Sequence, residues 1–258
     1  RDDTLRRSLP FRIGFPDSMP KSVIHRLIEP ALQVERPGRL VCREAPLAEL
    51  LAELGPQRAQ ALYQGTVDAV GLIRRRIQEH GIRCEATDAG VIWANWFRDP
   101  SALRARQRLL AENFGVQWQW LDRGEMAERI SSERYTEGLY EANALHFDPL
   151  AYARGLADVA QARGVRLHEA SPALALDRDG GGWRVRTPEG EVHARHVVLA
   201  CGGYLAGLRR DVDAGVMPIA TYVMVTEPLG PRLDEVLRTR AAIYDSRFAF
   251  DYYRPLPD

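Results

Sequence analysis

The chain has 258 residues, of which 45% are hydrophobic, and 35 basic side chains balance 35 acidic ones. Zero net charge gives no long-range attraction to nucleic acid or to an anionic membrane, so we expect neither as a partner. Three widely spaced cysteines (Cys42, Cys84 and Cys201) form no CxxC pair, which excludes a disulfide framework and favours a reducing, cytoplasmic location. No apolar run approaches the roughly 20 residues of a membrane span, and no segment resembles a signal peptide.

The first 81 residues divide into an irregular segment and a helical one. Residues 1–40 contain five prolines and little periodicity, which predicts loop with one helix near residues 21–29. Residues 41–81 carry apolar side chains at helical spacing, in two runs separated by Gly55-Pro56. Gly81 follows the second run and is expected to end that helix in a left-handed conformation.

Residues 82–144 alternate strands and helices. The expected elements are a strand, turn and strand over 82–96, a polar helix over 101–113 and a strand over 116–121. Trp118 and Trp120 stand two residues apart in the last strand and are expected in the core of a sheet. Asp122 and Glu125 have the spacing of a capping box, which predicts a short helix after that strand.

The second half of the chain is more regular. Asp148-Pro149 is a strong helix start, and that helix is expected to end at Gly164. The expected elements after it are a strand over 165–171, an antiparallel meander over 172–194, an apolar strand over 196–200, and longer strands over 217–229 and 242–256. The alternation of helices and strands predicts a mixed α/β fold.

The stretch HVVLACGGYLAGL, residues 196–208, combines an apolar strand with a bare glycine tip. A strand that is apolar on both faces is typical of the centre of a parallel sheet covered by helices. Glycines at its carboxyl end remove the Cβ atoms that would keep a ligand from the backbone, and ligands bind at that edge of open α/β sheets. The tip is therefore suited to a flat or phosphorylated group, although a buried strand followed by a plain glycine turn explains the pattern equally well.

Six stretches, taken in chain order, point to one family. They are RRRIQEHGIRCEATDAGVIWA, SSERYTEGLYEANALHFDPL, RGVRLHEASPALAL, TPEGEVHARHVVLACGGYLAGL, VMPIATYVMVTEPL and FAFDYYRPLPD, within roughly residues 40–258. Together they resemble the D-amino-acid-oxidase-like FAD-dependent oxidoreductases, and within these the gamma-glutamylputrescine oxidoreductase group and related amine or amino-acid oxidases. The resemblance implies FAD as cofactor and oxidation of a C–N bond in a small amine or amino-acid substrate.

The resemblance also implies a domain plan. A partial FAD/NAD(P)-binding Rossmann-like sheet is combined with a largely antiparallel substrate-binding sheet. The segments are an irregular lead-in (1–40), a helical region (41–81), the first substrate-domain part (82–144), the FAD-binding part (145–215) and the second substrate-domain part (216–258).

Single positions take roles from the same resemblance. The backbone of Ala173 is placed at the adenine of FAD, and the tip formed by Ala200, Cys201, Gly202 and Gly203 at the ribose and pyrophosphate. The sheet formed by residues 216–226 and 243–254 is expected to cover the isoalloxazine ring and hold the substrate. Tyr222, Tyr252 and Arg254 are its candidate substrate-binding residues.

One family feature is missing. Binding a dinucleotide pyrophosphate requires a G-x-G-x-x-G turn between a strand and its helix, and this spacing does not occur in the sequence. The family also continues beyond DYYRPLPD into a further strand and a last FAD-contacting segment. We therefore expect either a partial record of a complete enzyme or a natural fragment, for which the alternative function is non-catalytic binding of a small ligand or a partner chain.

The residues themselves leave several roles open. A tyrosine hydroxyl and a guanidinium are suited to orienting a substrate carboxylate, so Tyr252 and Arg254, on one face of a strand, are candidates beside the alternative of ordinary cross-strand packing. Tyr222 is a candidate on the same terms. His146 is a candidate general base, although a structural histidine is the stronger interpretation. Cys201 is expected to be a small buried residue beside the cofactor. No His, Asp or Glu set has metal-ligand spacing, and no GxSxG motif occurs, so the catalytic residues stay unassigned and no metal is expected.

Overall fold

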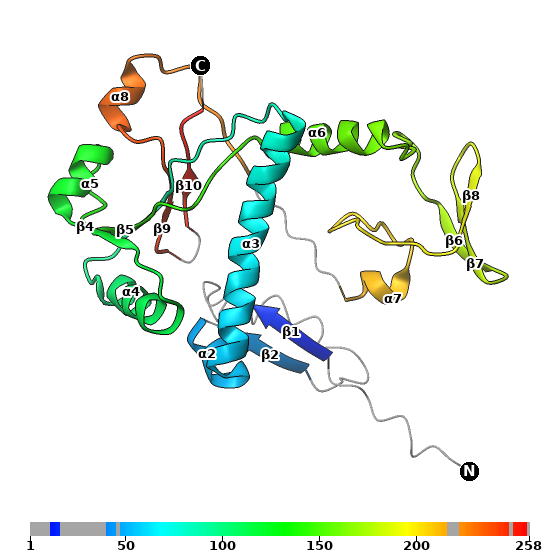
Figure 1. The fold of residues 1–258 in the computed structure, drawn as a ribbon, viewed down its shortest axis with the longest axis horizontal. Helices are drawn as coiled ribbons and strands as arrows, with labels where there is room; N and C mark the ends of the chain where they lie inside the picture. The colour runs from blue at the N-terminus through cyan, green and yellow to red at the C-terminus, as the bar shows by residue number, and fades with distance from the viewer. Residues whose placement is uncertain (1–10, 16–39, 45–46, 216–221, 248–249, 257–258) are drawn as a thin grey trace, which may run out of the picture. The chain divides into compact units, whose positions relative to one another are not determined.

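We describe a computed structural model of the chain, which places residues 11–15, 40–44, 47–215, 222–247 and 250–256 (Figure 1). The chain divides into two compact units: unit 1 is formed by Arg1–Leu156 and Pro228–Asp258, and unit 2 by Ala157–Glu227. Each unit is described by itself. The helix expected near residues 21–29 lies outside the described residues, as does the 216–221 part of the strand expected over 217–229.

Unit 1 is built around a five-stranded sheet with the order β10-β9-β3-β5-β4. Its strands are β3 (Val91–Ala94), β4 (Gln119–Leu121), β5 (Gly138–Glu141), β9 (Ala242–Asp245) and β10 (Tyr252–Tyr253). β3 and β9 pair in parallel, and every other neighbouring pair is antiparallel. The expected largely antiparallel second sheet, formed by two distant segments of the chain, is confirmed, and so is the mixed α/β class.

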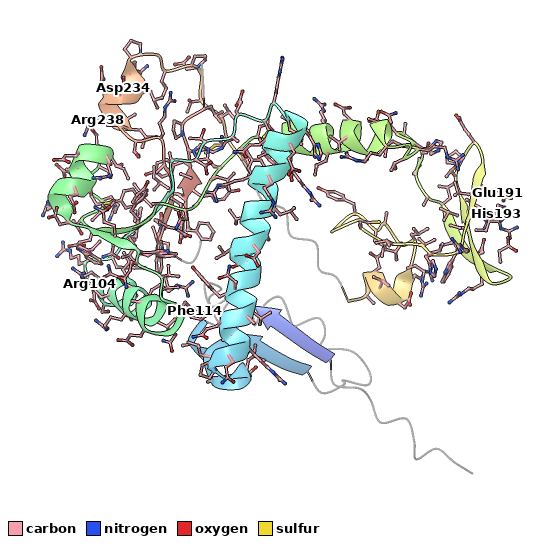
Figure 2. The ribbon with its side chains drawn as sticks, viewed as in Figure 1. Arg104, Phe114, Glu191, His193, Asp234 and Arg238 are labelled. Carbon is pink, nitrogen blue, oxygen red and sulfur yellow. The ribbon has the colours of Figure 1, made fainter. Side chains whose placement is uncertain are left out.

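One face of this sheet carries the hydrophobic core of unit 1. Ile92 and Ala94 of β3, Leu121 of β4 and Ile243 of β9 are almost fully buried. They pack with Met126 of α5 (Arg123–Arg129) and with neighbours from the segment that includes α8 (Arg232–Val236). Arg238 joins the two segments: its guanidinium donates to the carbonyl oxygens of Ala127 (2.6 Å) and Glu128 (3.0 Å) at the end of α5 (Figure 2).

The helices begin and end where local sequence places them. They are α2 (Leu47–Leu54), α3 (Pro56–His80) and α4 (Ser101–Phe114). Gly81 ends α3 with φ 59° and ψ 35°, the left-handed conformation that glycine adopts without steric cost. At α5, Asp122 and Glu125 form both hydrogen bonds of a capping box, each 2.9 Å long.

Helix α3 is fixed to unit 1 at two levels. Near its start, Gln60 Nε2 donates to the Asn113 carbonyl (2.7 Å), and Tyr63 packs on Phe114 with ring centroids 4.8 Å apart (Figure 2 labels Phe114). Nearer its end, Arg74 forms an ion pair with Asp88 at 2.7 Å. The strand-turn-strand expected over 82–96 contains only β3, because the segment before it forms a single isolated bridge, Thr87 to His146.

Residues 1–40 contain more structure than expected. β1 (Phe11–Phe15) pairs in parallel with β2 (Leu40–Glu44), with Phe11 opposite Leu40. The interpretation of this segment as mostly loop was wrong for residues 11–15, where Phe11, Ile13 and Phe15 alternate with Arg12 and Gly14 as side chains of a strand do.

Unit 2 contains a three-stranded antiparallel sheet, as expected for the meander. Its strands are β6 (Ala175–Asp179), β7 (Gly182–Arg186) and β8 (Glu191–Ala194), in the order β6-β7-β8. On β8, His193 lies between two carboxylates, with Nε2 2.8 Å from Glu191 Oε1 (Figure 2) and Nδ1 2.8 Å from Asp179 Oδ2. These bonds raise the pKa of His193. α6 (Pro149–Ala162) leads into this unit and begins at the expected Asp148 cap, whose Oδ1 accepts from the backbone N–H groups of Leu150 and Ala151.

The prediction of three strands in this unit was wrong. Residues 165–171, 196–200 and 222–229 form no strand in the structure. Val198, expected at the centre of a covered sheet, is 87% exposed. A strand exists only where neighbouring strands accept its hydrogen bonds, and in the described part of unit 2 no strand lies beside residues 196–200. The only other helix described in unit 2 is the short α7 (Arg210–Asp213).

Candidate functional site

The second face of the five-stranded sheet in unit 1 is lined by aromatic side chains. Residues directly opposite each other on neighbouring strands share a face, and the register aligns one residue from each strand. The row is Trp120, Leu139, Trp93, Tyr244 and Tyr252. Because Ile92 and Ile243 point into the core, their neighbours Trp93 and Tyr244 lie on the opposite face. With Phe250 added, we call this set the aromatic face.

The rings of the aromatic face contact one another. Trp93 stacks on Tyr244 with centroids 6.0 Å apart and planes 13° from parallel. Phe250 lies 6.1 Å from Tyr244 and 5.9 Å from Tyr252. Phe250 is 42% exposed and Tyr252 is 57% exposed, whereas the core face is closed. These rings therefore form a partly solvent-accessible apolar surface.

Helix α4 helps to cover the β4–β5 part of this face. Leu103 and Leu110 of α4 are buried, and the guanidinium of Arg104 lies 3.3 Å from the centroid of Trp120 (Figure 2 labels Arg104). Trp120 is thus held by a cation–π contact. At the β9–β10 end the rings of Phe250 and Tyr252 are exposed, so this is the part of the face that a ligand could contact.

A second row on the same face ends in a carboxylate. Val91 is opposite Glu141 on β5 and opposite Ala242 on β9. Burial raises the pKa of the Glu141 carboxyl group, and the positive charge of Arg106 partly opposes that shift. Burial also raises the pKa of Tyr244 to about 12. This carboxylate was not singled out in the sequence, because only the register of β3 and β5 places it beside the rings.

Arg254 and His146 are 108 residues apart in the sequence and meet in the structure. Arg254 Nη1 lies 3.2 Å from His146 Nδ1, and His146 Nε2 lies 2.8 Å from the carbonyl oxygen of Arg240. A carbonyl only accepts and a guanidinium only donates, so Nε2 carries the proton and Nδ1 accepts from Arg254. His146 is therefore neutral with both ring nitrogens occupied, which fits the structural interpretation of this residue and leaves no free nitrogen for a general base.

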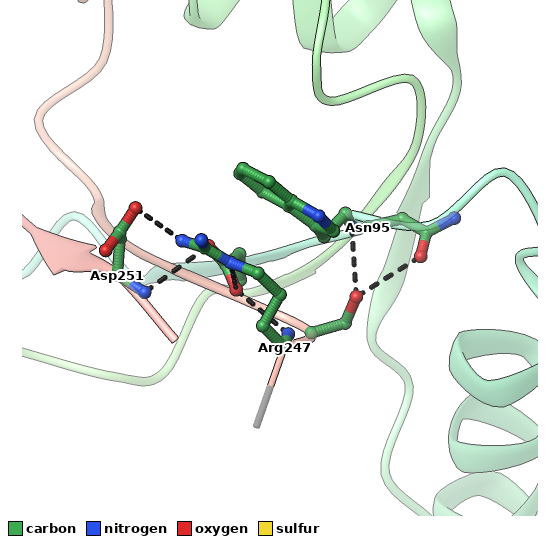
Figure 3. Close-up of polar contacts among 6 residues, drawn as sticks. Asn95, Arg247 and Asp251 are labelled. Carbon is green, nitrogen blue, oxygen red and sulfur yellow. Dashed lines mark hydrogen bonds and ion pairs between the residues drawn. The ribbon is translucent and has the colours of Figure 1, made fainter. Parts of the chain in front are cut away.

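A polar clamp holds the β9–β10 hairpin that carries Tyr252 and Arg254 (Figure 3). The buried Asp245 accepts from Arg247 at Nη2 (2.7 Å) and Nε (3.0 Å), and Arg247 also pairs with Asp251. The guanidinium of Arg247 packs 3.6 Å from the centroid of Trp96. Ser246 Oγ accepts from the Trp96 backbone N–H at 2.9 Å, which ties the hairpin to the end of β3. Bonding to the two carboxylates raises the pKa of Arg247.

The candidate cofactor-binding residues lie in unit 2 and are exposed. They are Ala173, Ala200, Cys201, Gly202 and Gly203. Residues 201–204 form a turn in which Tyr204 N–H donates to the Cys201 carbonyl at 3.0 Å. Gly202 has φ +55°, and a Cβ built there meets no atom within 4 Å. Exposed backbone with open space in front is what close approach of a flat group requires, so the tip fits part of an FAD site. The expectation that Cys201 is buried was wrong, because the segment before it forms no covered strand.

The structure groups the candidates in two sets. Tyr252 and Arg254 stand together on the β9–β10 hairpin of unit 1. Tyr222 belongs to unit 2, where it is 90% exposed, and no described contact joins it to the other two. Among the described residues, no three His, Cys, Asp or Glu side chains are arranged to hold a metal ion, and no helix is long and apolar enough to cross a membrane.

Comparison with known proteins identifies the family. The family model described as "DAO: FAD dependent oxidoreductase" matches residues 27–258. The protein named "Probable oxidoreductase OrdL" of Haemophilus influenzae is 27% identical over 217 residues, which are 82% of this chain and 50% of that protein. The gamma-glutamylputrescine oxidoreductase of Escherichia coli is 28% identical over 206 residues, 79% of this chain and 48% of that protein. The chain spans about half the length of the curated relatives it matches.

Solved structures support the same fold. L-proline dehydrogenase from P. horikoshii superposes with a TM-score of 0.56 at 15% identity, covering 73% of this chain and 51% of that chain. Glycine oxidase from Bacillus cereus superposes with a TM-score of 0.54 at 15% identity, covering 80% and 55%. These likenesses concern the fold alone, whereas the family model extends over most of the chain. The chain belongs to the DAO family of FAD-dependent oxidoreductases, whose cofactor is FAD.

Proposed function

We propose that the protein oxidises a C–N bond of a small amine or amino acid with FAD as its cofactor. The observation that carries this proposal is the match of residues 27–258 to the FAD-dependent oxidoreductase family. The name of the Escherichia coli relative, gamma-glutamylputrescine oxidoreductase, supports an amine as the substrate class. A cytoplasmic enzyme without a nucleic-acid or membrane partner is part of the proposal, on the grounds of charge balance and cysteine usage.

Two parts of the chain would hold the cofactor and substrate. The backbone of Ala173 and the turn at Ala200 and Gly202 would contact the adenosine half of FAD, because they are bare and exposed. The exposed rings of Phe250 and Tyr252 would pack against apolar or flat groups. When bound, FAD supplies the acceptor for the hydride that leaves the carbon bearing the amine.

The chain's own residues have binding and positioning roles. Arg254 is bonded to His146 through Nη1, and its remaining N–H groups, which bond to no other residue in the described part of the chain, could bind a carboxylate of the substrate. His146 holds that guanidinium in place. Apolar rings exclude water from the bound amine, which favours its neutral, oxidisable form. Substrate oxidation of this kind needs no acid-base side chain from the protein, and the described residues of the aromatic face provide no histidine for one.

A spectroscopic experiment tests the proposal. Protein held in excess FAD, because the chain lacks the G-x-G-x-x-G turn and is expected to bind the cofactor weakly, is mixed anaerobically with a panel of primary amines and amino acids, and the visible flavin absorption is followed against FAD without protein. Bleaching by an amine, with release of ammonia or an aldehyde on hydrolysis, is the expected result. A yellow protein that no amine or amino acid bleaches would refute the proposal.

A second candidate is non-catalytic binding of a small ligand. It is favoured by one specific observation, the absence of the G-x-G-x-x-G turn from the 258 residues. A protein that stays colourless in excess FAD and still binds an amine on the aromatic face would support this second function.

A further inference from the structure

Arg254 is a half-buried cation that forms no ion pair with a carboxylate in the described part of the chain. It directly follows β10, and its Nη1 donates to Nδ1 of His146 at 3.2 Å. A charged group that leaves water without a counter-charge is costly, so an anion is the ligand that suits this guanidinium. Among the described residues the neutral imidazole of His146 is its one side-chain partner, and the other N–H groups stay open to that anion.

The ring of His146 is fixed by contacts with two other segments. Its Nε2 donates to the carbonyl oxygen of Arg240 at 2.8 Å. Its backbone forms both hydrogen bonds of the bridge with Thr87, at 2.8 and 3.1 Å. Because Nε2 carries the proton, Nδ1 keeps a lone pair, and Arg254 donates to that lone pair. The position of Arg254 therefore depends on the protonation state of this ring.

The segments around His146 carry other charged or titratable side chains. They are Cys84, Glu85 and Asp88 beside the Thr87 bridge, Asp148 at the start of α6, and Arg240 before β9. Asp88 forms an ion pair with Arg74, and the carboxylate of Asp148 caps α6. In the described part of the chain none of these side chains bonds to the imidazole. Arg254 is therefore the charge that meets the ring directly.

A second proton on His146 would reverse this contact. An imidazolium carries an N–H at both ring nitrogens, so Nδ1 could no longer accept from Arg254, and two cations would stand at hydrogen-bond distance. The guanidinium would then have to turn away from the ring. We propose that His146 is a proton-controlled positioning residue: its neutral form holds Arg254 in the orientation that binds a carboxylate, and its protonation releases Arg254. That this carboxylate belongs to the substrate rests on the proposed function.

The direction and size of the effect follow from this arrangement. Histidine takes its second proton between about pH 8 and pH 5, so carboxylate affinity at Arg254 should fall as the pH falls through that range. The apparent affinity scales with the fraction of the protein in the binding-competent form. One pH unit below half-protonation of the ring, roughly a tenth of the rings are neutral, so binding should be about tenfold weaker than at high pH. An imidazolium that joined Arg254 in binding the anion would give the opposite direction.

Binding of a simple carboxylate at several pH values tests the switch without chemistry at the flavin. The probe is methoxyacetate, whose carboxyl group, like an α-carboxyl group, stays ionised between about pH 5 and pH 8. It is titrated into the full chain and followed by ligand-observed NMR, with methoxyacetamide as the uncharged probe of similar shape. Arg254→Gln removes the guanidinium and identifies the part of the binding that depends on it.

Three further variants separate the charge of the ring from its shape. His146→Asn keeps a hydrogen-bond acceptor near the place of Nδ1 and does not titrate, so methoxyacetate binding should stay strong at every pH. His146→Phe keeps a ring without an acceptor, so binding should be weak at every pH. His168→Asn removes an exposed histidine of unit 2 and is the control, whose pH profile should match that of the unmodified protein. Circular dichroism checks that each variant is folded at each pH.

An Arg254-dependent affinity that is equal at about pH 5 and pH 8, or that rises toward acid pH, would overturn the switch. A fall in affinity that persists in His146→Asn would also overturn it, because another group would then be titrating. Methoxyacetate binding that is unchanged in Arg254→Gln would overturn the anion site itself.

The proposed function fails separately. If protein in excess FAD oxidises no amine or amino acid while methoxyacetate binding follows the expected pH profile, the switch stands and the activity does not. If a substrate that carries a carboxylate is oxidised with the same KM by Arg254→Gln and by the unmodified protein, the anion bound at Arg254 is not the substrate.

Discussion

The β9–β10 hairpin allows the two faces of the sheet to be compared by paired substitutions. Ile243 points into the closed core and is 1% exposed, whereas Tyr252, on the strand paired with it, lies on the aromatic face and is 57% exposed. Ile243→Ala removes three buried carbons at about 0.8 kcal/mol each. The cavity left between Ile92 and its neighbours raises the expected loss of unfolding free energy to about 3–4 kcal/mol. Tyr252→Leu removes a mostly solvated ring and should cost less than about 1 kcal/mol.

Urea unfolding followed by circular dichroism measures the loss of unfolding free energy in both variants. The slope of that free energy against urea concentration should be the same in the variants and in the unmodified protein. A ligand-binding assay on the same samples gives the opposite order: Tyr252→Leu should weaken binding of an aromatic or amine ligand, and Ile243→Ala should not while it remains folded. If Tyr252→Leu destabilised the chain as much as Ile243→Ala, the aromatic face would be packed core. A ligand surface there would then be refuted.

Three further predictions concern charge, glycine conformation and the cofactor. Burial raises the pKa of Glu141, so the folded chain binds the carboxyl proton more tightly than the unfolded chain and loses stability as pH rises through the raised pKa. Glu141→Gln should therefore raise Tm at about pH 7 and leave it unchanged at about pH 4. A rise in Tm at about pH 4 alone would contradict the direction of this pKa shift. Gly202→Val should lower the affinity for FAD, since φ +55° is strained for a β-branched residue and the valine side chain would occupy the open space that the cofactor needs. Unchanged affinity at unchanged far-UV circular dichroism would remove the tip from the cofactor site. Titration of residues 1–258 with FAD should show weak binding or none, because no G-x-G-x-x-G turn holds the pyrophosphate; tight stoichiometric binding would show that other groups do so.

Helix positions could be predicted from sequence because their causes are local. The capping box at Asp122 and Glu125, the cap at Asp148 and the left-handed Gly81 each depend on residues within one turn. The antiparallel meander was predictable for the same reason, since Gly180 and Gly190 mark its turns between adjacent strands. Local sequence was sufficient for these elements.

Strand pairing between distant segments could not be predicted in the same way. Residues 196–200 have the composition of a central strand, but composition does not supply neighbouring strands, and the segment stays open. The aromatic face was missed for a related reason. Tyr252 was singled out for its own chemistry, whereas Trp93 and Tyr244 gained significance only from the register that aligns them with it. Glu141 was also missed, because no motif in the residues next to it in the sequence indicates a site. The assignments of Ala173, Ala200, Cys201, Gly202, Gly203 and Tyr222 stay predictions.

The order of segments in unit 1 has a consequence for how the protein folds during synthesis. Unit 2, Ala157–Glu227, is translated after β3, β4 and β5 and before β9 and β10. The edge of β3 that later pairs with β9 therefore waits, unpaired and apolar, until the whole insertion has left the ribosome. Closure of the sheet joins residues about 150 positions apart, and contacts of such separation form slowly. We expect nascent chains stopped before Ala242 to aggregate and to bind chaperones, and chains extended past Tyr253 to be released.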